Sequence, residues 1–131
     1  MLAAVAAVCV DGLAAQAKAQ QVTIDVKPGD EVTTIEDRDG MIPVVLLTTS
    51  TFDAATADPD SIRIGPKGTE ATVFRSMLED IDRDGDVDRM MLIRVKEMAI
   101  KCGDTVIRLT GLTLDGRAIE GSESVTVDGC N

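Results

Sequence analysis

Five aspartates alternate along one short stretch of the chain, Asp80-Ile81-Asp82-Arg83-Asp84-Gly85-Asp86-Val87-Asp88. They stand at loop positions 1, 3, 5, 7 and 9, with glycine at position 6, which matches the first part of an EF-hand calcium loop, D-x-D-x-D-G. A hard cation such as Ca²⁺ takes about six to eight oxygen ligands, and side chains at alternate positions of a tight turn converge on one point. The spacing therefore predicts a calcium site.

The positions within the loop give each aspartate an expected role. Asp80, Asp82 and Asp84 are expected to bind Ca²⁺ through their carboxylates. Asp86 stands at position 7, where the backbone carbonyl is the usual ligand. Gly85 permits the sharp, positive-φ conformation that the turn needs at position 6. We expect the loop to bind one ion with oxygen ligands alone, a set that suits Ca²⁺ better than Mg²⁺ or a soft metal.

The loop departs from an EF-hand in two respects. Position 12 is Met91, which offers no carboxylate, so we expect Asp88 at position 9 to bind the ion directly in its place. The flanking residues have the pattern of strands rather than helices, which predicts a strand-loop-strand site. Val87 is expected to point its side chain back at the core as an apolar anchor.

An acidic turn without metal is the alternative interpretation of this loop. Like charges 4 Å apart repel by about 1 kcal/mol even in bulk water, and a turn needs one or two aspartates rather than five, so calcium binding is the favoured hypothesis. A second, weaker cation site at Asp37 and Asp39 is a lesser alternative, because Asp39-Gly40 is also typical of an ordinary turn.

The composition of the 131-residue chain excludes several classes of function. With no His it has neither a Ser-His-Asp triad nor a His-ligated zinc. A net charge of -10 and only two aromatic residues argue against nucleic-acid binding and against stacking on bases or sugars. We therefore expect a protein that is not an enzyme and has no nucleic-acid partner.

The elements that must position the loop are short strands separated by turns, with a single helical turn expected between residues 50 and 58. Residues 41–47 are almost continuously apolar, which favours a strand covered on both faces, and Gly111 is expected at a bulge. This pattern predicts an all-β, antiparallel, Ig-like β-sandwich formed by residues 20–131 as one domain. The other expected strands are 22–26, 61–64, 71–78, 90–95, 105–109 and 122–127.

Residues 1–19 are predicted to be a secretory signal peptide, with an Ala-rich apolar run and the Ala17-Lys18-Ala19 cleavage pattern. No Lys or Arg precedes the apolar run, which is explained if the true start of the signal lies upstream of Met1. A short N-terminal helix is the alternative to a signal peptide. The apolar run is too short to span a bilayer. Cleavage leaves Cys102 and Cys130, and an even pair in an exported chain favours a disulfide, with two buried free thiols as the alternative.

Several segments together resemble a small β-sandwich module of secreted and cell-surface proteins of bacteria and archaea. They are VTIDVKPGD, GMIPVVLLTTSTFDAATADPDSIRIGP, LEDIDRDGDVDRMMLI and CGDTVIRLTGLTLDGRAIEGSESV. The match runs from about Val22 to Cys130, although residues 30–34 replace a segment that is usually Asn-rich in that family. The resemblance implies a Ca²⁺ site at the aspartate loop, a disulfide between Cys102 and Cys130, and no known catalytic activity.

The leading functional hypothesis is a non-catalytic, secreted or cell-surface module with one structural Ca²⁺, and a periplasmic location is also compatible with export. The alternative is an adhesion or interaction module that docks on a surface polymer or protein through a sandwich face or a strand edge. An enzyme that uses the metal is disfavoured, because it would need an open coordination position in a concave pocket. Neither a particular partner nor an oligomeric state follows from the sequence.

Overall fold

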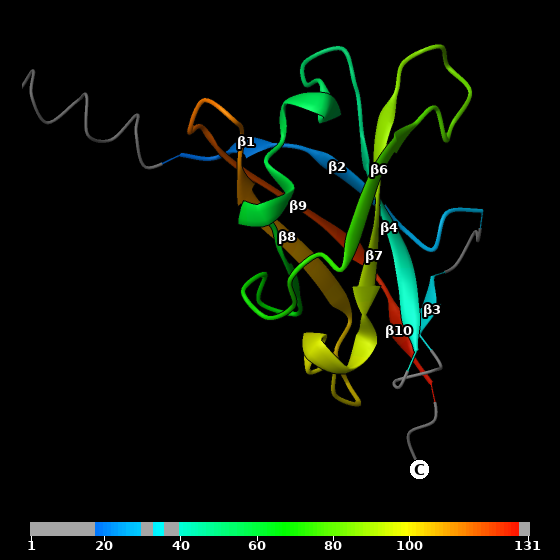
Figure 1. Ribbon diagram of the computed structural model, residues 1–131. Helices are drawn as coiled ribbons and strands as arrows, with labels where there is room; N and C mark the ends of the chain where they lie inside the picture. The colour runs from blue at the N-terminus through cyan, green and yellow to red at the C-terminus, as the bar shows by residue number, and fades with distance from the viewer. Residues whose placement is uncertain (1–17, 30–32, 36–39, 129–131) are drawn as a thin grey trace, which may run out of the picture.

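The computed structural model describes residues 18–29, 33–35 and 40–128, which form two packed sheets (Figure 1). The first sheet has the strand order β1-β9-β8-β5 and the second has the order β2-β4-β7-β6. A two-stranded pair of β10 and β3 adds to the end of the sandwich near the C-terminus. The strands are β1 (Gln20–Gln21), β2 (Thr23–Val26), β3 (Thr34–Ile35), β4 (Met41–Leu47), β5 (Arg63–Gly65), β6 (Arg75–Glu79), β7 (Asp88–Arg94), β8 (Val106–Leu112), β9 (Ala118–Ser124) and β10 (Thr126–Val127).

The main pairings are antiparallel, which confirms the predicted all-β sandwich. The two exceptions are short parallel pairs, β1 with β9 and β10 with β3. Strand β4 spans the predicted residues 41–47, with Pro43 as its third residue. The single helical turn expected near residue 54 is the 3₁₀ helix η1 (Ala54–Thr56), and two others, η2 (Pro59–Ser61) and η3 (Val95–Met98), were not predicted.

The core lies between the two sheets and is built mainly from aliphatic side chains and Met, with Phe52 as its one aromatic ring among the described residues. Side chains along a strand alternate between its faces, so every second residue of β2, β4 and β7 enters the core. In β4, Ile42, Val44 and Leu46 enter the core; Val45 is also fully buried but lies on the opposite face of the strand, and Met41 at its start is 44% exposed. The largest fully buried side chains are Ile35, Leu46, Ile62, Ile64, Met91, Ile93, Met98, Ile107, Leu109 and Ile119.

Gly111 does not form the expected bulge. Strands β8 and β9 pair in unbroken register from Val106 with Ser124 to Leu112 with Ala118, and Gly111 faces Ile119 within this ladder. A Cβ atom at Gly111 would come within 2.9 Å of the Ile62 side chain, so the position needs glycine for close packing. The change of face at Gly111 in the sequence was therefore interpreted wrongly, because close packing against Ile62, and not a bulge, accounts for the glycine.

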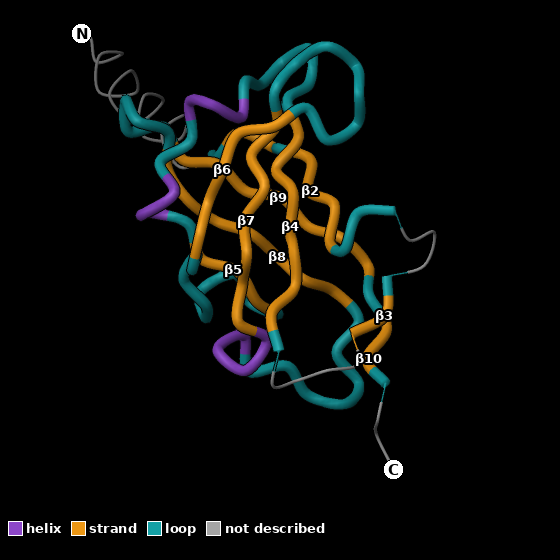
Figure 2. The backbone as a smooth tube through the Cα atoms, turned by 45° about the vertical axis from the view of Figure 1, so that its right-hand side comes forward, coloured by secondary structure: helices purple, strands orange, loops and turns teal. Residues whose placement is uncertain are grey.

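The β6–β7 hairpin carries the aspartate loop beyond one end of the second sheet (Figures 1 and 2). Strand β7 pairs with β6 on one side and with β4 on the other, so the end of the loop is fixed to the centre of the sheet. Within the described part of the chain, no helix has the length and apolar character required to cross a bilayer.

Candidate metal centre

Three of the five aspartates bring a carboxylate oxygen to one place in the loop. One oxygen each from Asp80, Asp82 and Asp88 lies within 4.8 Å of the others. Asp80 directly follows β6, Asp82 lies in the turn, and Asp88 is the first residue of β7. Oxygens from both ends of one hairpin loop thus converge, which is the arrangement that a hard cation such as Ca²⁺ requires.

Asp88 is the fixed member of this group. It is fully buried, and its two carboxylate oxygens accept backbone hydrogen bonds from different segments. The Thr48 amide donates to Oδ1 at 2.9 Å, and the Ile81 amide donates to Oδ2 at 3.0 Å. The Thr48 hydroxyl in turn donates to the Val87 carbonyl at 2.6 Å and accepts from the Ala54 amide at 2.8 Å. Asp88 therefore ties both ends of the loop to the segment that follows β4.

Asp80 organises the turn itself. Its Oδ1 accepts from the Asp84 amide at 3.2 Å and its Oδ2 accepts from the Gly85 amide at 3.0 Å. Gly85 has a φ of +96°, the left-handed region where glycine is favoured, and Arg83 also lies there with a φ of +59°. The loop backbone thus folds around the Asp80 carboxylate, and the positive φ expected at Gly85 is confirmed.

The electrostatics of the loop concentrate on Asp82. Its pKa is raised from 3.8 to about 6 by partial loss of solvent around the carboxyl group, by a hydrogen bond with the Asp84 side chain, and by the negative charges of Asp88 and Asp84. The ionised loop is therefore under like-charge repulsion, which a bound cation relieves. The chemistry of the donor set, carboxylates without nitrogen or sulfur, fits a hard divalent ion.

The structure does not bring the two remaining aspartates into the group of three. The Asp84 carboxylate accepts from the Asp86 amide at 2.9 Å, and the Asp86 side chain is exposed. Val87 does not point its side chain into the core, because that side chain is 44% exposed. It anchors the loop through its backbone carbonyl, which accepts from Thr48. Met91, at the EF-hand's position 12, is fully buried in the core instead.

Two residues that support the loop were missed in the sequence. Thr48 follows an apolar strand, where a threonine carries no signal of its own. Arg89 is only 8% exposed, and its guanidinium donates to the Ala54 and Ala55 carbonyls at 3.2 and 3.3 Å and to the Ser76 hydroxyl at 2.7 Å. Arg89 thus joins β6, β7 and η1, and its place next to Asp88 along the chain indicated none of these partners.

The other predicted features lie wholly or partly outside the described residues. Asp37 and Asp39 are outside them, and so is almost all of the predicted signal peptide. Cys102 lies in an exposed turn before β8, while Cys130 falls beyond residue 128, so their disulfide stays a prediction. Among the described residues, a surface cavity of about 510 Å³ lies between the η1 segment and the β8–β9 turn and includes none of the loop aspartates.

Comparisons with known proteins give no family. No protein-family model and no curated protein matches the chain. Among solved structures, one similar chain is a bacterial immunoglobulin-like domain from the M. primoryensis ice-binding adhesin, with 21% identity and a TM-score of 0.45. The match covers 86% of this chain and 100% of that domain. A structure of a 1.5-MDa bacterial ice-binding adhesin, described in connection with host cell surface retention, matches with the same identity and TM-score over 33% of its chain.

Proposed function

We propose that this protein is a non-catalytic, exported module whose aspartate loop binds one structural Ca²⁺. The observation that carries the proposal is the convergence of Asp80, Asp82 and Asp88, whose carboxylate oxygens lie within 4.8 Å of one another. Asp84 completes the side-chain ligands after a rotation that releases the Asp86 amide, and the backbone carbonyl at position 7 supplies a further oxygen.

In this proposal the ion connects the two ends of the aspartate loop. Asp88 already holds the loop to the backbone of Thr48 beyond β4 and of Ile81 within the turn. Ca²⁺ bound to Asp88 together with Asp80 and Asp82 joins the two strands of the β6–β7 hairpin through a single divalent ion. Because the ion binds the folded loop and not the random chain, its binding free energy adds to the stability of the fold.

Thermal unfolding, followed by far-UV circular dichroism, tests this function. The chain has neither Trp nor Tyr, so intrinsic fluorescence is of no use. At a Ca²⁺ concentration of 100 times the dissociation constant, one site stabilises the fold by about 2.7 kcal/mol relative to the same protein in EDTA. We expect a rise of several degrees in Tm with Ca²⁺ and a much smaller rise with Mg²⁺.

Matched variants separate the site from the general acidity of the chain. Asp80→Asn removes a ligand and should abolish the Ca²⁺ response. Asp60→Asn removes the same charge from an exposed position of η2 and should leave the response intact. A Tm that is the same in Ca²⁺ and in EDTA, or a response that survives Asp80→Asn, contradicts the proposal.

The interaction-module function is the second candidate, and one observation favours it. Large apolar side chains are exposed on β6 and beside it, where a partner could cover them: Phe74, Met77 and Leu78 are 45%, 39% and 48% exposed. An interaction role is compatible with a structural ion, because Ca²⁺ would stiffen the hairpin to which β6 belongs. Cell-surface or extracellular placement and cleavage near residue 20 belong to the same proposal, and N-terminal sequencing of the exported protein tests them.

A further inference from the structure

Strand β6 is the open edge of the sandwich among the residues that the structure describes (Figure 2). At the edge of the other sheet, β5 is covered, because Ile64 and Ala71 exchange backbone hydrogen bonds of 2.9 Å. On the far edge of its own sheet, β2 lies against β9, and the Val26 amide donates to the Glu123 carboxylate at 2.8 Å. Strand β1 has only two residues. An uncovered strand presents backbone donors and acceptors to which another strand can pair.

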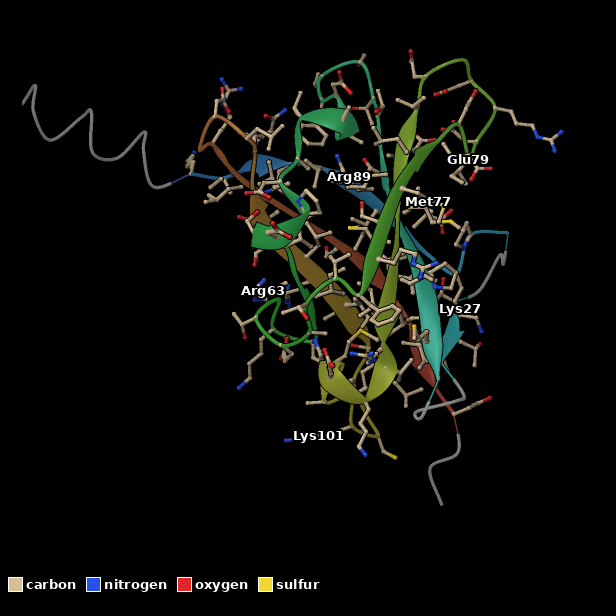
Figure 3. The ribbon with its side chains drawn as sticks, in the orientation of Figure 1. Lys27, Arg63, Met77, Glu79, Arg89 and Lys101 are labelled. Carbon is tan, nitrogen blue, oxygen red and sulfur yellow. The ribbon has the colours of Figure 1, made fainter. Side chains whose placement is uncertain are left out.

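The same strand exposes apolar side chains on both of its faces. Successive residues of a strand point to opposite faces, yet Met77 is 39% exposed and Leu78 is 48% exposed. Figure 3 shows Met77 and Glu79 on the side of β6 away from Arg89. The strand contains no Lys or Pro, residues that commonly protect a sheet edge, and its two charged residues, Arg75 and Glu79, stand at its ends. An added strand would cover backbone and apolar surface together.

The sequence of β6, Arg-Ser-Met-Leu-Glu, is complementary to itself when one copy is reversed. We propose that β6 pairs antiparallel with β6 of a second copy of this chain, with Met77 facing Met77 on the two-fold axis. In this register Arg75 of each copy lies opposite Glu79 of the other, and these side chains share one face of the sheet. Within the described residues, neither Arg75 nor Glu79 makes a side-chain hydrogen bond or an ion pair of its own.

Backbone geometry supports this register. In an antiparallel ladder, alternate residues of an edge strand direct both backbone groups outward. The register pairs odd-numbered residues with odd-numbered ones and even with even, so outward groups of one copy meet outward groups of the other. The antiparallel direction also places the two acidic 80–88 loops at opposite ends of the paired strands. A parallel pairing would bring those loops together and set like charges side by side.

The dimer is expected to be weak. A contact formed by one five-residue strand from each copy falls below the about 1,200 Å² typical of stable interfaces, in the range of transient complexes. The net charge of -10 on each copy adds long-range repulsion, which salt screens. Sedimentation velocity with interference optics, at chain concentrations from micromolar to millimolar and in EDTA with moderate salt, measures this association independently of calcium. We expect the sedimentation coefficient to rise from the monomer to the dimer value with concentration.

Charge reversal tests the register. Arg75→Glu and Glu79→Arg each set like charges opposite each other at two places, and each should weaken the dimer about tenfold. An equimolar mixture of these two variants restores both opposite-charge pairs and should form heterodimers as readily as the wild type dimerises. The double variant Arg75→Glu/Glu79→Arg should likewise dimerise at the wild-type level.

A control variant and a fold check accompany these measurements. Leu114→Lys changes a 72% exposed apolar residue between β8 and β9 and should leave dimerisation unchanged. Far-UV circular dichroism verifies that each variant folds, as expected for substitutions of exposed side chains. A wild-type protein that stays monomeric at millimolar concentration overturns the proposal. So does a dimer that the single reversals do not weaken, or one that neither the mixture nor the double variant restores.

Discussion

Asp88→Ala should destabilise the fold even when no metal is present. The Asp88 side chain is fully buried, and its oxygens accept hydrogen bonds from the Thr48 and Ile81 amides at 2.9 and 3.0 Å. A hydrogen bond to a charged group contributes roughly 1.5–3 kcal/mol, and truncation leaves two amides without an acceptor. We therefore expect a loss of about 3–5 kcal/mol, a large part of the about 5–15 kcal/mol that stabilises a typical domain.

Urea unfolding in EDTA, followed by far-UV circular dichroism, measures this loss. The midpoint should fall while the slope with denaturant stays the same, because the fold itself is retained. Asp86→Ala is the matched control, since that carboxylate is exposed and accepts no hydrogen bond from the described residues, and it should change stability by less than about 0.5 kcal/mol. If Asp88→Ala lowers the free energy of unfolding no more than Asp86→Ala does, the buried Asp88 carboxylate does not stabilise the loop as we infer.

Three further predictions concern charge, a buried cation and the cysteines. Because the pKa of Asp82 is raised to about 6 in the fold, the free energy of unfolding in EDTA should increase as pH falls through that value. Asp82→Asn should raise Tm in EDTA at neutral pH and should reduce the gain in Tm from Ca²⁺. A lower Tm for Asp82→Asn than for the wild type in EDTA would contradict the like-charge repulsion. Arg89→Met should cost about 2–4 kcal/mol in urea unfolding, because the Ala55 carbonyl and the Ser76 hydroxyl lose their donor and the Ala54 carbonyl keeps only the Ala57 amide; a neutral effect would contradict this role. If Cys102 and Cys130 form a disulfide, its reduction should lower the free energy of unfolding by about 3–4 kcal/mol. A thiol titration of the denatured chain that finds every cysteine reactive would refute the disulfide.

Local patterns in the sequence located most of the long strands but not all of their bounds. The expected strand 71–78 is β6 at Arg75–Glu79, and the expected strand 122–127 falls across the end of β9 (Ala118–Ser124) and β10 (Thr126–Val127). Residues 41–47 form β4 as predicted, because a continuous apolar run between polar segments has few alternatives to a buried strand. Gly85 has the positive φ that its place in the loop predicted, and the hydrogen bonds to Asp80 that form this turn span only four and five residues. Short-range geometry of this kind is encoded in neighbouring residues.

Contacts between distant segments could not be predicted in the same way. The contact between Thr48 and Asp88 spans forty residues, and it arises only because β4 and β7 are neighbours in the sheet. For the same reason Val87, expected to anchor through its side chain, does so through its carbonyl. The open edge at β6 is likewise a property of strand order, which alternation along one strand does not reveal.

Equilibrium dialysis against Ca²⁺, with metal analysis of the protein compartment, tests the calcium site most directly. Protein stripped with EDTA and dialysed at neutral pH against millimolar Ca²⁺ should retain one Ca²⁺ per chain above the free concentration, and should do so in the presence of an equal concentration of Mg²⁺. Asp80→Asn should retain none, and Asp60→Asn should retain one. Wild-type protein that retains no more Ca²⁺ than Asp80→Asn would contradict the account, and the loop would then be an acidic turn without a metal.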